Sequence, residues 1–268
     1  MSVRRFWASA STLVLAVVAA LGMAQPASAT SSAAAGGYVA LGDSYSSGVG
    51  SGSYLSDSGD CRRSTKAYPY LWAAANSPAS FAFVACSGAT TGSVAGSQLG
   101  VLSSSTTLVS VTAGGNDVGF ADVMQDCVLY SESTCVSSVN VAVSQMQNSL
   151  PSGLGSLYSA IRSRAPQAHV VVLGYPRFYQ LNGTCIAGLT ETERSAINNA
   201  SDVLNGVIAK QAANAGFTFS GVVDEFTEHE LCSGDAWLNS VTLPVYNSYH
   251  PKAAGQSGGY LPAFRSVA

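Results

Sequence analysis

The chain has 268 residues, of which 47% are hydrophobic and only 10% are charged, and its net charge is −3. It contains no basic block and no basic run interleaved with aromatic residues, so nucleic acid is not an expected partner. With so few charges, we expect a surface rich in Ser, Thr, Asn, Gln and Gly, which tolerates lipid or polymer interfaces.

The first residues have the pattern of a secretory signal peptide. Arg4-Arg5 precedes an apolar run from Leu13 to Met23, and small residues follow. The run is shorter than a typical transmembrane helix. We therefore expect a signal peptide over residues 1–34, with cleavage after Ala34, or after Ala29.

The remaining residues, 35–268, are expected to form one soluble, extracellular domain. No later stretch is long and apolar enough to cross a bilayer, and no linker or internal repeat divides this part of the chain. Its length lies in the range of a single α/β domain. We expect a monomer that makes no stable insertion into a membrane.

The six cysteines imply disulfides, because their number is even and the chain is expected to be secreted. Six cysteines can pair in many ways, and their order along the chain favours the sequential set Cys61–Cys86, Cys127–Cys135 and Cys185–Cys232. Their spacing is irregular and contains no C-x-x-C, which argues against a zinc site. Paired cysteines would also leave no thiol for catalysis.

Short apolar runs typical of buried strands alternate with stretches typical of helices. Strands are expected at about 38–41, 81–86, 108–112, 169–174 and 217–223, and helices at about 66–76, 136–164 with a break near Pro151, and 190–215. We expect a last helix to have Pro251 in its first turn. This alternation predicts a parallel sheet with helices on both faces, and a site beyond the carboxyl ends of its strands.

Three of these strands end in polar turns that carry the groups needed for acyl transfer. Ser44, in Gly42-Asp43-Ser44-Tyr45-Ser46, offers a nucleophilic hydroxyl and a backbone N–H. Gly88 offers a backbone N–H without a side chain, and Asn116 offers its amide NH₂. Each of the three also fits an ordinary turn, so the interpretation rests on their occurrence at successive strand ends.

His250 is the best candidate for a catalytic base among the three histidines. His169 opens a strand and so lies at the amino end of the sheet, and His229 lies close to a presumed disulfide and is assigned a structural role. His250 lies on a loop, from which a base can reach inward. The stretch Gly255–Gly259 matches the G-x-S-x-G nucleophile elbow, but no strand precedes it and no histidine follows it, so we reject it.

With these residues in place, the chain resembles the GDSL, or SGNH, hydrolase superfamily. Gly42–Ser46 matches its first block, Gly88 the second, Gly114–Asp117 the third and His250-Pro251 the fifth. The blocks cover nearly the whole expected mature chain. The resemblance is greatest to the secreted streptomycete GDSL lipase and phospholipase A1 group, which shares the plan of six cysteines.

The resemblance implies a three-layer α/β/α sandwich with a mostly five-stranded parallel sheet, as in flavodoxin-like SGNH hydrolases. It also implies carboxylic-ester hydrolysis without a metal or an organic cofactor, and the three sequential disulfides. In this interpretation Ser44 is the nucleophile and His250 the base. The oxyanion hole consists of Ser44, Gly88 and Asn116.

The chain departs from the superfamily at Asn247, three residues before His250, where an aspartate usually completes a triad. Because Asn247 cannot be a carboxylate, we expect a Ser44–His250 dyad. The backbone carbonyl of Ser248, or with less support that of Asn247, would then orient the ring. Asp224 and Asp235 stay open as remote replacements for the missing acid.

The expected activity is cleavage of fatty-acyl esters such as triacylglycerols through an acyl-enzyme. Alternatives are phospholipase A1 as the main activity, a carbohydrate acetylesterase, and a secreted binding protein on a hydrolase fold. By position alone, the loops Ser46–Ser58 and Leu181–Leu189 are candidates for lining the acyl-binding groove.

Overall fold

The computed structural model describes Met1 and residues 36–186 and 188–268. The chain divides into two units, Met1–Ser32 and Ala33–Ala268. The fold described below is that of the second unit. The expected signal peptide and its cleavage sites lie, apart from Met1, outside the described residues. No helix within the described ranges is both long and apolar enough to cross a membrane.

Five parallel strands form one sheet in the order β2-β1-β3-β4-β5. The strands are β1 (Gly37–Gly42), β2 (Ser80–Phe83), β3 (Thr106–Thr112), β4 (His169–Leu173) and β5 (Thr218–Ser220). The three central strands, β1, β3 and β4, are apolar and buried on both faces, as parallel sheets require. The predicted five-stranded parallel sheet is confirmed.

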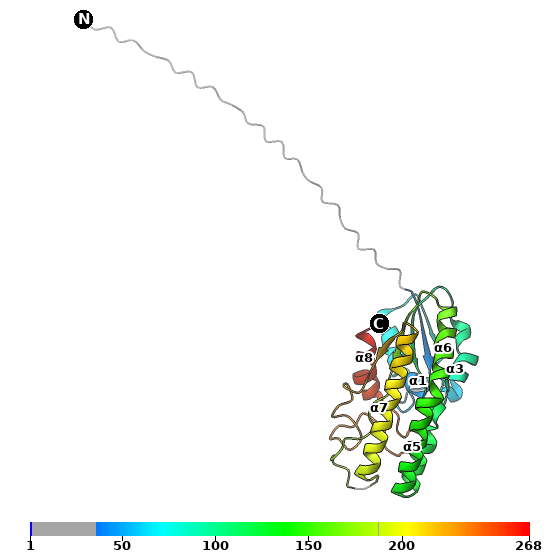
Figure 1. Cartoon of the computed structure of the whole chain (residues 1–268). Helices are drawn as coiled ribbons and strands as arrows, with labels where there is room; N and C mark the ends of the chain where they lie inside the picture. The colour runs from blue at the N-terminus through cyan, green and yellow to red at the C-terminus, as the bar shows by residue number, and fades with distance from the viewer. Residues whose placement is uncertain (2–35, 187) are drawn as a thin grey trace. The chain divides into compact units, whose positions relative to one another are not determined.

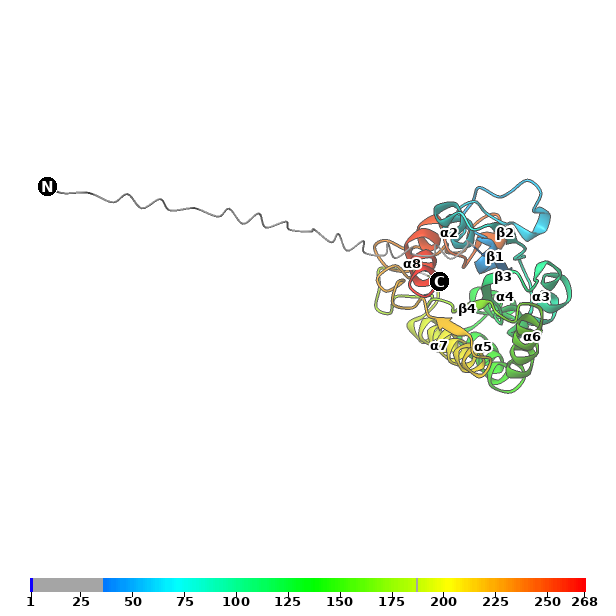
Figure 2. The same cartoon turned by 90° about the horizontal axis from the view of Figure 1, so that it is seen from above.

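Helices cover both faces of the sheet (Figure 1). The α-helices are α1 (Ser44–Ser47), α2 (Tyr68–Asn76), α3 (Thr91–Ser97), α4 (Phe120–Leu129), α5 (Glu132–Asn148), α6 (Leu150–Arg164), α7 (Glu191–Asn214) and α8 (Leu261–Arg265). Figure 2 shows α2 and α8 on one side of the strands and α3, α6, α5 and α7 on the other. The expected α/β/α sandwich is therefore confirmed.

Short 3-10 and π-helical turns complete the fold. The 3-10 turns are η1 (Gly59–Cys61), η2 (Leu99–Val101), η3 (Asn116–Val118) and η4 (Val245–Asn247), and the π-helical turn is η5 (Gly255–Tyr260). The rejected G-x-S-x-G stretch coincides with most of η5, and its Ser257 is exposed to solvent. No strand precedes it, so its geometry differs from that of a nucleophile elbow.

Several element boundaries differ from the sequence-based expectation. The strand expected at 81–86 is regular only to Phe83, because the N–H groups of Val84 and Ala85 both donate to the Ala40 carbonyl and break the ladder. The helical stretch expected at 136–164 is divided near Pro151, as expected, into α5 and α6, but α5 begins earlier, at Glu132, and Pro151 lies in the first turn of α6.

The expectation that Pro251 lies in the first turn of the last helix is wrong. Pro251 instead forms an antiparallel bridge with Leu238, and helical structure begins only at Ala253. The bridge joins the segment that carries His250 to the segment near residue 238. As a result, His250 lies in an irregular stretch that is paired with another loop.

Candidate active site

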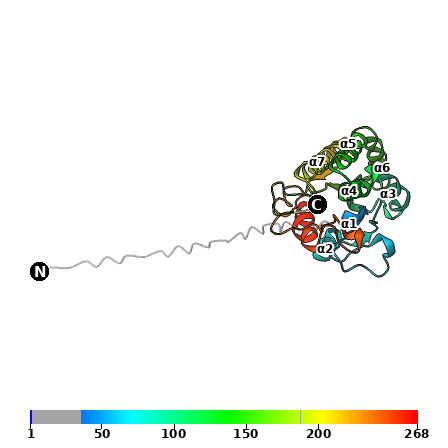
Figure 3. The same cartoon turned by 90° about the horizontal axis from the view of Figure 1, so that it is seen from below.

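The order of the strands brings the predicted site residues to one edge of the sheet. β1 lies between β2 and β3. The segments after these three strands carry Ser44, Gly88 and Asn116, and the segment after β4 carries Tyr175. Figure 3 shows α1 and α4 near the middle of the view from below. Residues more than 70 positions apart in the chain therefore meet around Ser44.

The turn that carries Ser44 depends on Gly42 and Asp43. Gly42 has φ +118°, and a Cβ at this position would lie 2.4 Å from the Thr112 carbonyl oxygen. Only glycine fits there. Asp43 is the N-cap of α1 and accepts a hydrogen bond from the Tyr45 N–H at 2.9 Å. Ser44 is thus the first residue of α1, where its own N–H has no helical acceptor.

Asp43 is buried and joins three elements of the fold. Besides the Tyr45 N–H, it accepts a hydrogen bond from the Thr112 hydroxyl at 2.6 Å and another from the Tyr175 hydroxyl. Burial raises the pKa of Asp43 to about 6, although these hydrogen bonds oppose the shift. Asp43 therefore fixes the turn that carries Ser44, and it makes no bond to His250.

His250 faces Ser44 directly. Its Nε2 lies 2.8 Å from the Ser44 Oγ, and its Nδ1 lies 2.9 Å from the Ser248 carbonyl oxygen. Since a carbonyl only accepts, Nδ1 carries the proton, and Nε2 is free to accept from the serine. Burial lowers the pKa of His250 to about 4, and hydrogen bonds to backbone carbonyls oppose this shift. The ring is therefore neutral near pH 7.

No carboxylate contacts either ring nitrogen of His250 among the described residues. The Asn247 carbonyl accepts the backbone N–H of His250 at 3.3 Å, and its side-chain Oδ1 accepts from the Tyr54 hydroxyl at 3.0 Å. Asp235 lies beside His229, with its Oδ2 3.3 Å from the His229 Nδ1, and it accepts from Trp237. The carbonyl of Ser248, rather than that of Asn247, is thus the group bonded to the ring.

Three residues at the cavity beside the Ser44 hydroxyl have a hydrogen-bond donor available. Within the described residues, the backbone N–H groups of Ser44 and Gly88 have no hydrogen-bond acceptor. The Asn116 amide donates one hydrogen to the Ala89 carbonyl at 3.0 Å, which orients it and leaves its second hydrogen available. All three residues line the same cavity. Gly88 has φ +76° and open space where a Cβ would point, so a substrate can approach it closely.

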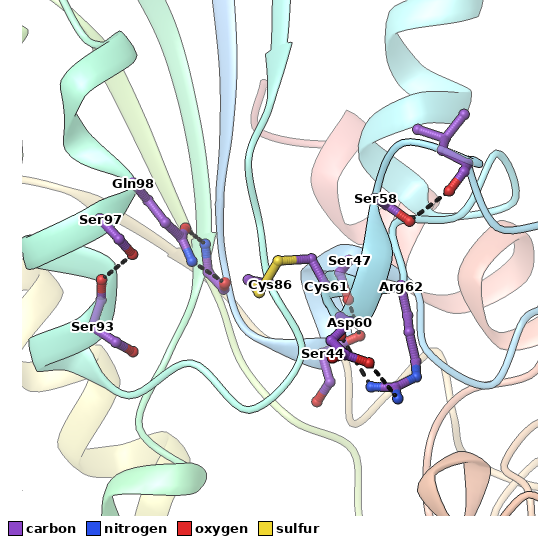
Figure 4. Close-up of a disulfide and its surroundings, with 12 residues drawn as sticks. Ser44, Ser47, Ser58, Asp60, Cys61, Arg62, Cys86, Ser93, Ser97 and Gln98 are labelled. Atoms are coloured by element: carbon purple, nitrogen blue, oxygen red, sulfur yellow. Dashed lines mark hydrogen bonds and ion pairs between the residues drawn. A yellow bond between two sulfur atoms is a disulfide. The ribbon is translucent and has the colours of Figure 1, made fainter.

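The loop that carries Gly88 is attached at several points. The Cys86 N–H donates to the Gly42 carbonyl at 2.9 Å, and the Ser87 N–H donates to the Cys61 carbonyl at 3.2 Å. The disulfide Cys61–Cys86 adds a covalent link (Figure 4). Gln98, also labelled in Figure 4, holds Gly42 from the other side through two backbone hydrogen bonds of 2.8 Å each. These bonds fix Gly88 relative to Ser44.

The other four cysteines pair as Cys127–Cys135 and Cys185–Cys232, so the described cysteines follow the sequential order. Cys127–Cys135 joins α4 to α5, whereas Cys185–Cys232 joins two loops. No group of three or more His, Cys, Asp or Glu side chains within the described ranges could hold a metal ion.

A cavity of about 600 Å³ opens beside Ser44 and His250. Its walls are mostly apolar and come from α4, α5, α7 and the segment 241–249, including Met124, Val139, Met146, Ile197 and Leu204. A cavity of this volume with mostly apolar walls has room for a hydrocarbon chain. Neither Ser46–Ser58 nor the described part of Leu181–Leu189 lines this cavity, so for these residues that expectation is wrong.

Several residues that support the site carry no sequence signal of their own. The side-chain amide of Asn205 on α7 accepts from the backbone N–H of Tyr175 and donates to its backbone carbonyl, both at 2.8 Å. The Tyr45 hydroxyl donates to the Tyr249 carbonyl at 2.7 Å, directly before His250. Asn239 bonds the Gly50 and His250 carbonyls. A tyrosine after a strand or an asparagine inside a helix is too common to be singled out from sequence alone.

The other two histidines lie away from the site, as expected. The His169 Nε2 is bonded to the Val267 carbonyl at the amino end of β4. The His229 ring stacks on Trp237 with 3.6 Å between ring centroids. Neither ring lines the cavity beside Ser44.

The sequence and the structure are similar to those of known bacterial proteins. The chain is 62% identical to Lipase 1 of Streptomyces coelicolor over 96% of each chain. A crystal structure of phospholipase A1 from Streptomyces albidoflavus matches with a TM-score of 0.86 and 65% identity, covering 88% of this chain and 100% of that one. An extracellular lipase from Streptomyces rimosus matches with a TM-score of 0.86 and 58% identity, covering 87% of this chain and 100% of that one.

The family model of GDSL-like lipases and acylhydrolases matches residues 40–257. This range includes the Ser44 turn, the Gly88 loop, Asn116 and His250, which the fold brings to one cavity. The match and the relatives agree with the arrangement of strands and turns described above. The chain therefore belongs to the GDSL-like lipase/acylhydrolase family.

Proposed function

We propose that this protein is a secreted serine ester hydrolase that cleaves fatty-acyl esters such as triacylglycerols. The main support is the Ser44 Oγ to His250 Nε2 distance of 2.8 Å at the wall of a largely apolar cavity. The relatives named lipase and phospholipase A1 support the same class of substrate. The Streptomyces rimosus relative is named an extracellular enzyme, which supports secretion.

In the proposed mechanism, the acyl chain lies in the cavity and its ester carbonyl lies against Ser44. His250 accepts the Ser44 proton at Nε2 while the Ser44 oxygen forms a bond to the carbonyl carbon. The carbonyl oxygen becomes an oxyanion, which accepts from the N–H groups of Ser44 and Gly88 and from the Asn116 amide. His250 then gives the proton to the leaving alcohol as the ester bond breaks.

Hydrolysis of the acyl-enzyme repeats these steps with water. His250 accepts a proton from water, whose oxygen attacks the acyl carbon, and then returns that proton to Ser44 as the acid leaves. In each half of the reaction the imidazolium is stabilised by the Ser248 carbonyl, which bonds Nδ1. A carbonyl dipole fixes the tautomer but stabilises the positive charge less than a carboxylate does.

The cavity favours long or medium acyl chains over acetyl groups. A carbohydrate acetylesterase needs room for one methyl group, whereas the apolar space here is about 600 Å³. Phospholipase A1 activity uses the same residues and differs only in the alcohol that leaves, so it is the second candidate. The 65% identity to a phospholipase A1 supports testing it directly. A binding protein without activity is the remaining alternative.

A substrate panel tests the proposal. We expect the purified protein to hydrolyse p-nitrophenyl octanoate faster than the acetate, and to release fatty acid from triacylglycerol and from position 1 of phosphatidylcholine in a ratio that the panel measures. Ser44→Ala should abolish each activity, while Ser257→Ala, which changes the exposed serine of η5, should keep it. Equal activity of wild type and Ser44→Ala, or a preference for acetyl esters, would contradict the proposal.

Secretion and the single-domain, monomeric state form part of the same proposal. N-terminal sequencing of protein from culture medium should find residue 35 or residue 30 as the first residue. Size-exclusion chromatography with light scattering should give the mass of one chain. An uncleaved chain retained in cells, or a dimer, would contradict these points without bearing on the chemistry of Ser44.

A further inference from the structure

Exposed apolar side chains gather at the mouth of the cavity beside Ser44. They come from two segments, the end of α4 and the loop before η4 together with η4, and we call them the apolar rim: Val128, Leu129, Val241, Leu243, Val245 and Tyr246. All of them except Leu243 also line the cavity. Leu243 lies in the same loop, between two lining residues, and is 89% exposed.

This gathering is unusual for a surface that faces only water. Single exposed apolar residues are normal, and Val101 on η2 and Val141 on α5 are examples. A group of exposed apolar side chains around one opening, in contrast, indicates an interaction surface. The rim continues without a break into the apolar cavity, because most of its members belong to both.

The charges around the rim are of both signs and fit a neutral or zwitterionic partner. None of the six rim residues is charged. The guanidinium of Arg62 lies 4.0 Å from the centre of the Tyr246 ring and is paired with Asp60. Val128 and Val241 also line a second pocket, whose charged residues are two acidic and two basic: Glu132, Glu193, Arg194 and Lys252. Charges that balance in this way suit a layer of polar headgroups, whereas they give no strong attraction to a polyanion.

We propose that the apolar rim docks on the surface of a lipid aggregate, such as a phosphatidylcholine vesicle or a triacylglycerol droplet. This inference rests on the proposed function, because the cavity is taken to hold an acyl chain. A chain that leaves the aggregate through a docked rim passes from one apolar environment to another. Exposure of hydrocarbon to water is the main free-energy cost of extracting a lipid, and on this path the acyl chain avoids that exposure.

Binding of an inactive variant to vesicles tests the docking surface apart from the chemistry. Ser44→Ala should bind dioleoylphosphatidylcholine vesicles in a sedimentation assay, and the binding should persist in 0.5 M NaCl because apolar contacts are not screened. Adding Leu243→Asp or Leu243→Ser should weaken the binding about tenfold or more, since each removes the insertion of one leucine. Adding Leu243→Phe should preserve it.

Val101→Asp is the matched control. Val101 is 45% exposed and lies before β3, at the amino edge of the sheet, away from the rim. This change should leave vesicle binding unaltered. In an otherwise wild-type chain, Leu243→Asp should turn over a water-soluble short-chain ester at the normal rate, which also establishes that the variant folds, and should lose activity on vesicles.

Each other outcome has a distinct meaning. Unchanged vesicle binding by both Leu243 variants, or an equal loss with Val101→Asp, would overturn the proposal. Loss of vesicle binding in 0.5 M NaCl would show that the binding is electrostatic, and it would overturn the proposal that apolar contacts carry it. A wild-type dimer that Leu243→Asp dissociates would assign the rim to a second copy of the chain. Failure of the proposed function would appear separately, as absent turnover of the soluble ester by wild type.

Discussion

The two partners of the proposed reacting pair, Ser44 and His250, are held in opposite ways. Ser44 lies on a turn whose buried carboxylate, Asp43, receives hydrogen bonds from α1, from β3 and from Tyr175 after β4. His250 lies on an irregular segment, and its ring is oriented by a backbone carbonyl two residues earlier. The serine side is fixed by side chains from distant parts of the chain, whereas the ring of the histidine is oriented by the backbone of its own segment.

This difference shows which parts of such a site need particular residue types. A side-chain network demands Asp, Thr and Tyr at given positions, so the serine side carries a motif. A backbone carbonyl is supplied by any residue, so Ser248 has no signature, and Asn247 is free to serve Tyr54 instead. Burial acts on both sides in the same sense, since it favours the neutral forms of Asp43 and His250.

Removing the base should have the largest effect. We expect His250→Ala to lower kcat for a p-nitrophenyl ester about 10⁴-fold, at the upper end for a general base. Asn247→Ala, which removes a side chain without contact to the ring, should stay within about threefold of wild type, because the orienting carbonyl is kept. Steady-state kinetics of both variants measures this, and comparable losses in two folded variants would show that the Asn247 side chain takes part.

Removing a donor should have the next largest effect. Asn116→Ala should lower kcat about 10²–10³-fold with a small change in KM, because the oxyanion exists only in the transition state. Asn148→Ala, at the exposed end of α5, is the matched control and should behave as wild type. A change confined to KM would mean that Asn116 binds substrate rather than the oxyanion.

The pH dependence of stability should differ between the two sides. The pKa of His250 falls from 6.5 to about 4 on folding, so its contribution is present above pH 6.5 and is lost as the pH falls through 4. Folding raises the pKa of Asp43 from 3.8 to about 6, which gives the opposite pH dependence. Its contribution to the free energy of unfolding is present below pH 3.8 and is lost as the pH rises through 6.

Substitution of His250 isolates its contribution to the pH dependence of the free energy of unfolding. Between pH 7 and pH 4, the unfolding free energy of wild type should fall by roughly 3 kcal/mol more than that of His250→Gln. Asp43 is present in both proteins and cancels in the difference. Denaturant unfolding at the two pH values measures this. Parallel curves for the two proteins would show that the pKa of His250 is unchanged by folding.

Removing the hydrogen bond that the Tyr175 hydroxyl donates to Asp43 should have the smallest effect. Tyr175→Phe should destabilise the protein by about 2 kcal/mol at pH 8, because an ionised, buried carboxylate loses a donor. At pH 5 the loss should be smaller, since Asp43 is then mostly protonated and needs one donor fewer. Tyr130→Phe, which changes an exposed tyrosine, is the control. If the loss of stability in Tyr175→Phe were the same at both pH values, it would not depend on the charge of Asp43.

Much of the sheet could be predicted because its central strands are continuous apolar runs. Two helices were missed for local reasons. α3 has a capping box between Thr90 and Ser93, but the serine replaces the usual Glu or Gln that marks this motif. α4 follows Gly119 without any side-chain cap and has only ten residues, so no start signal precedes it.

Ser44, Gly88 and Asn116 could be picked out from the sequence because each lies in a short motif after a strand. His250, on an irregular segment, could be picked out because the chain offers only three histidines. The cavity could not, since its walls are assembled from α4, α5, α7 and the segment 241–249, which contact one another only in the folded chain. The Pro251 error has a similar origin. The fixed φ of proline suits the first turn of a helix. The conformation of Pro251 is instead determined by its bridge with Leu238, a contact that the residues next to Pro251 do not reveal.

The disulfide Cys61–Cys86 has a consequence for when the enzyme becomes competent. Cys86 lies two residues before Gly88, and the bond ties this loop to η1 beside the nucleophile turn. Disulfides form in oxidising compartments and are kept reduced in the cytosol. We expect a chain in which this disulfide is reduced to hold its Gly88 donor less firmly, so that oxidation of the two cysteines completes the arrangement around Ser44.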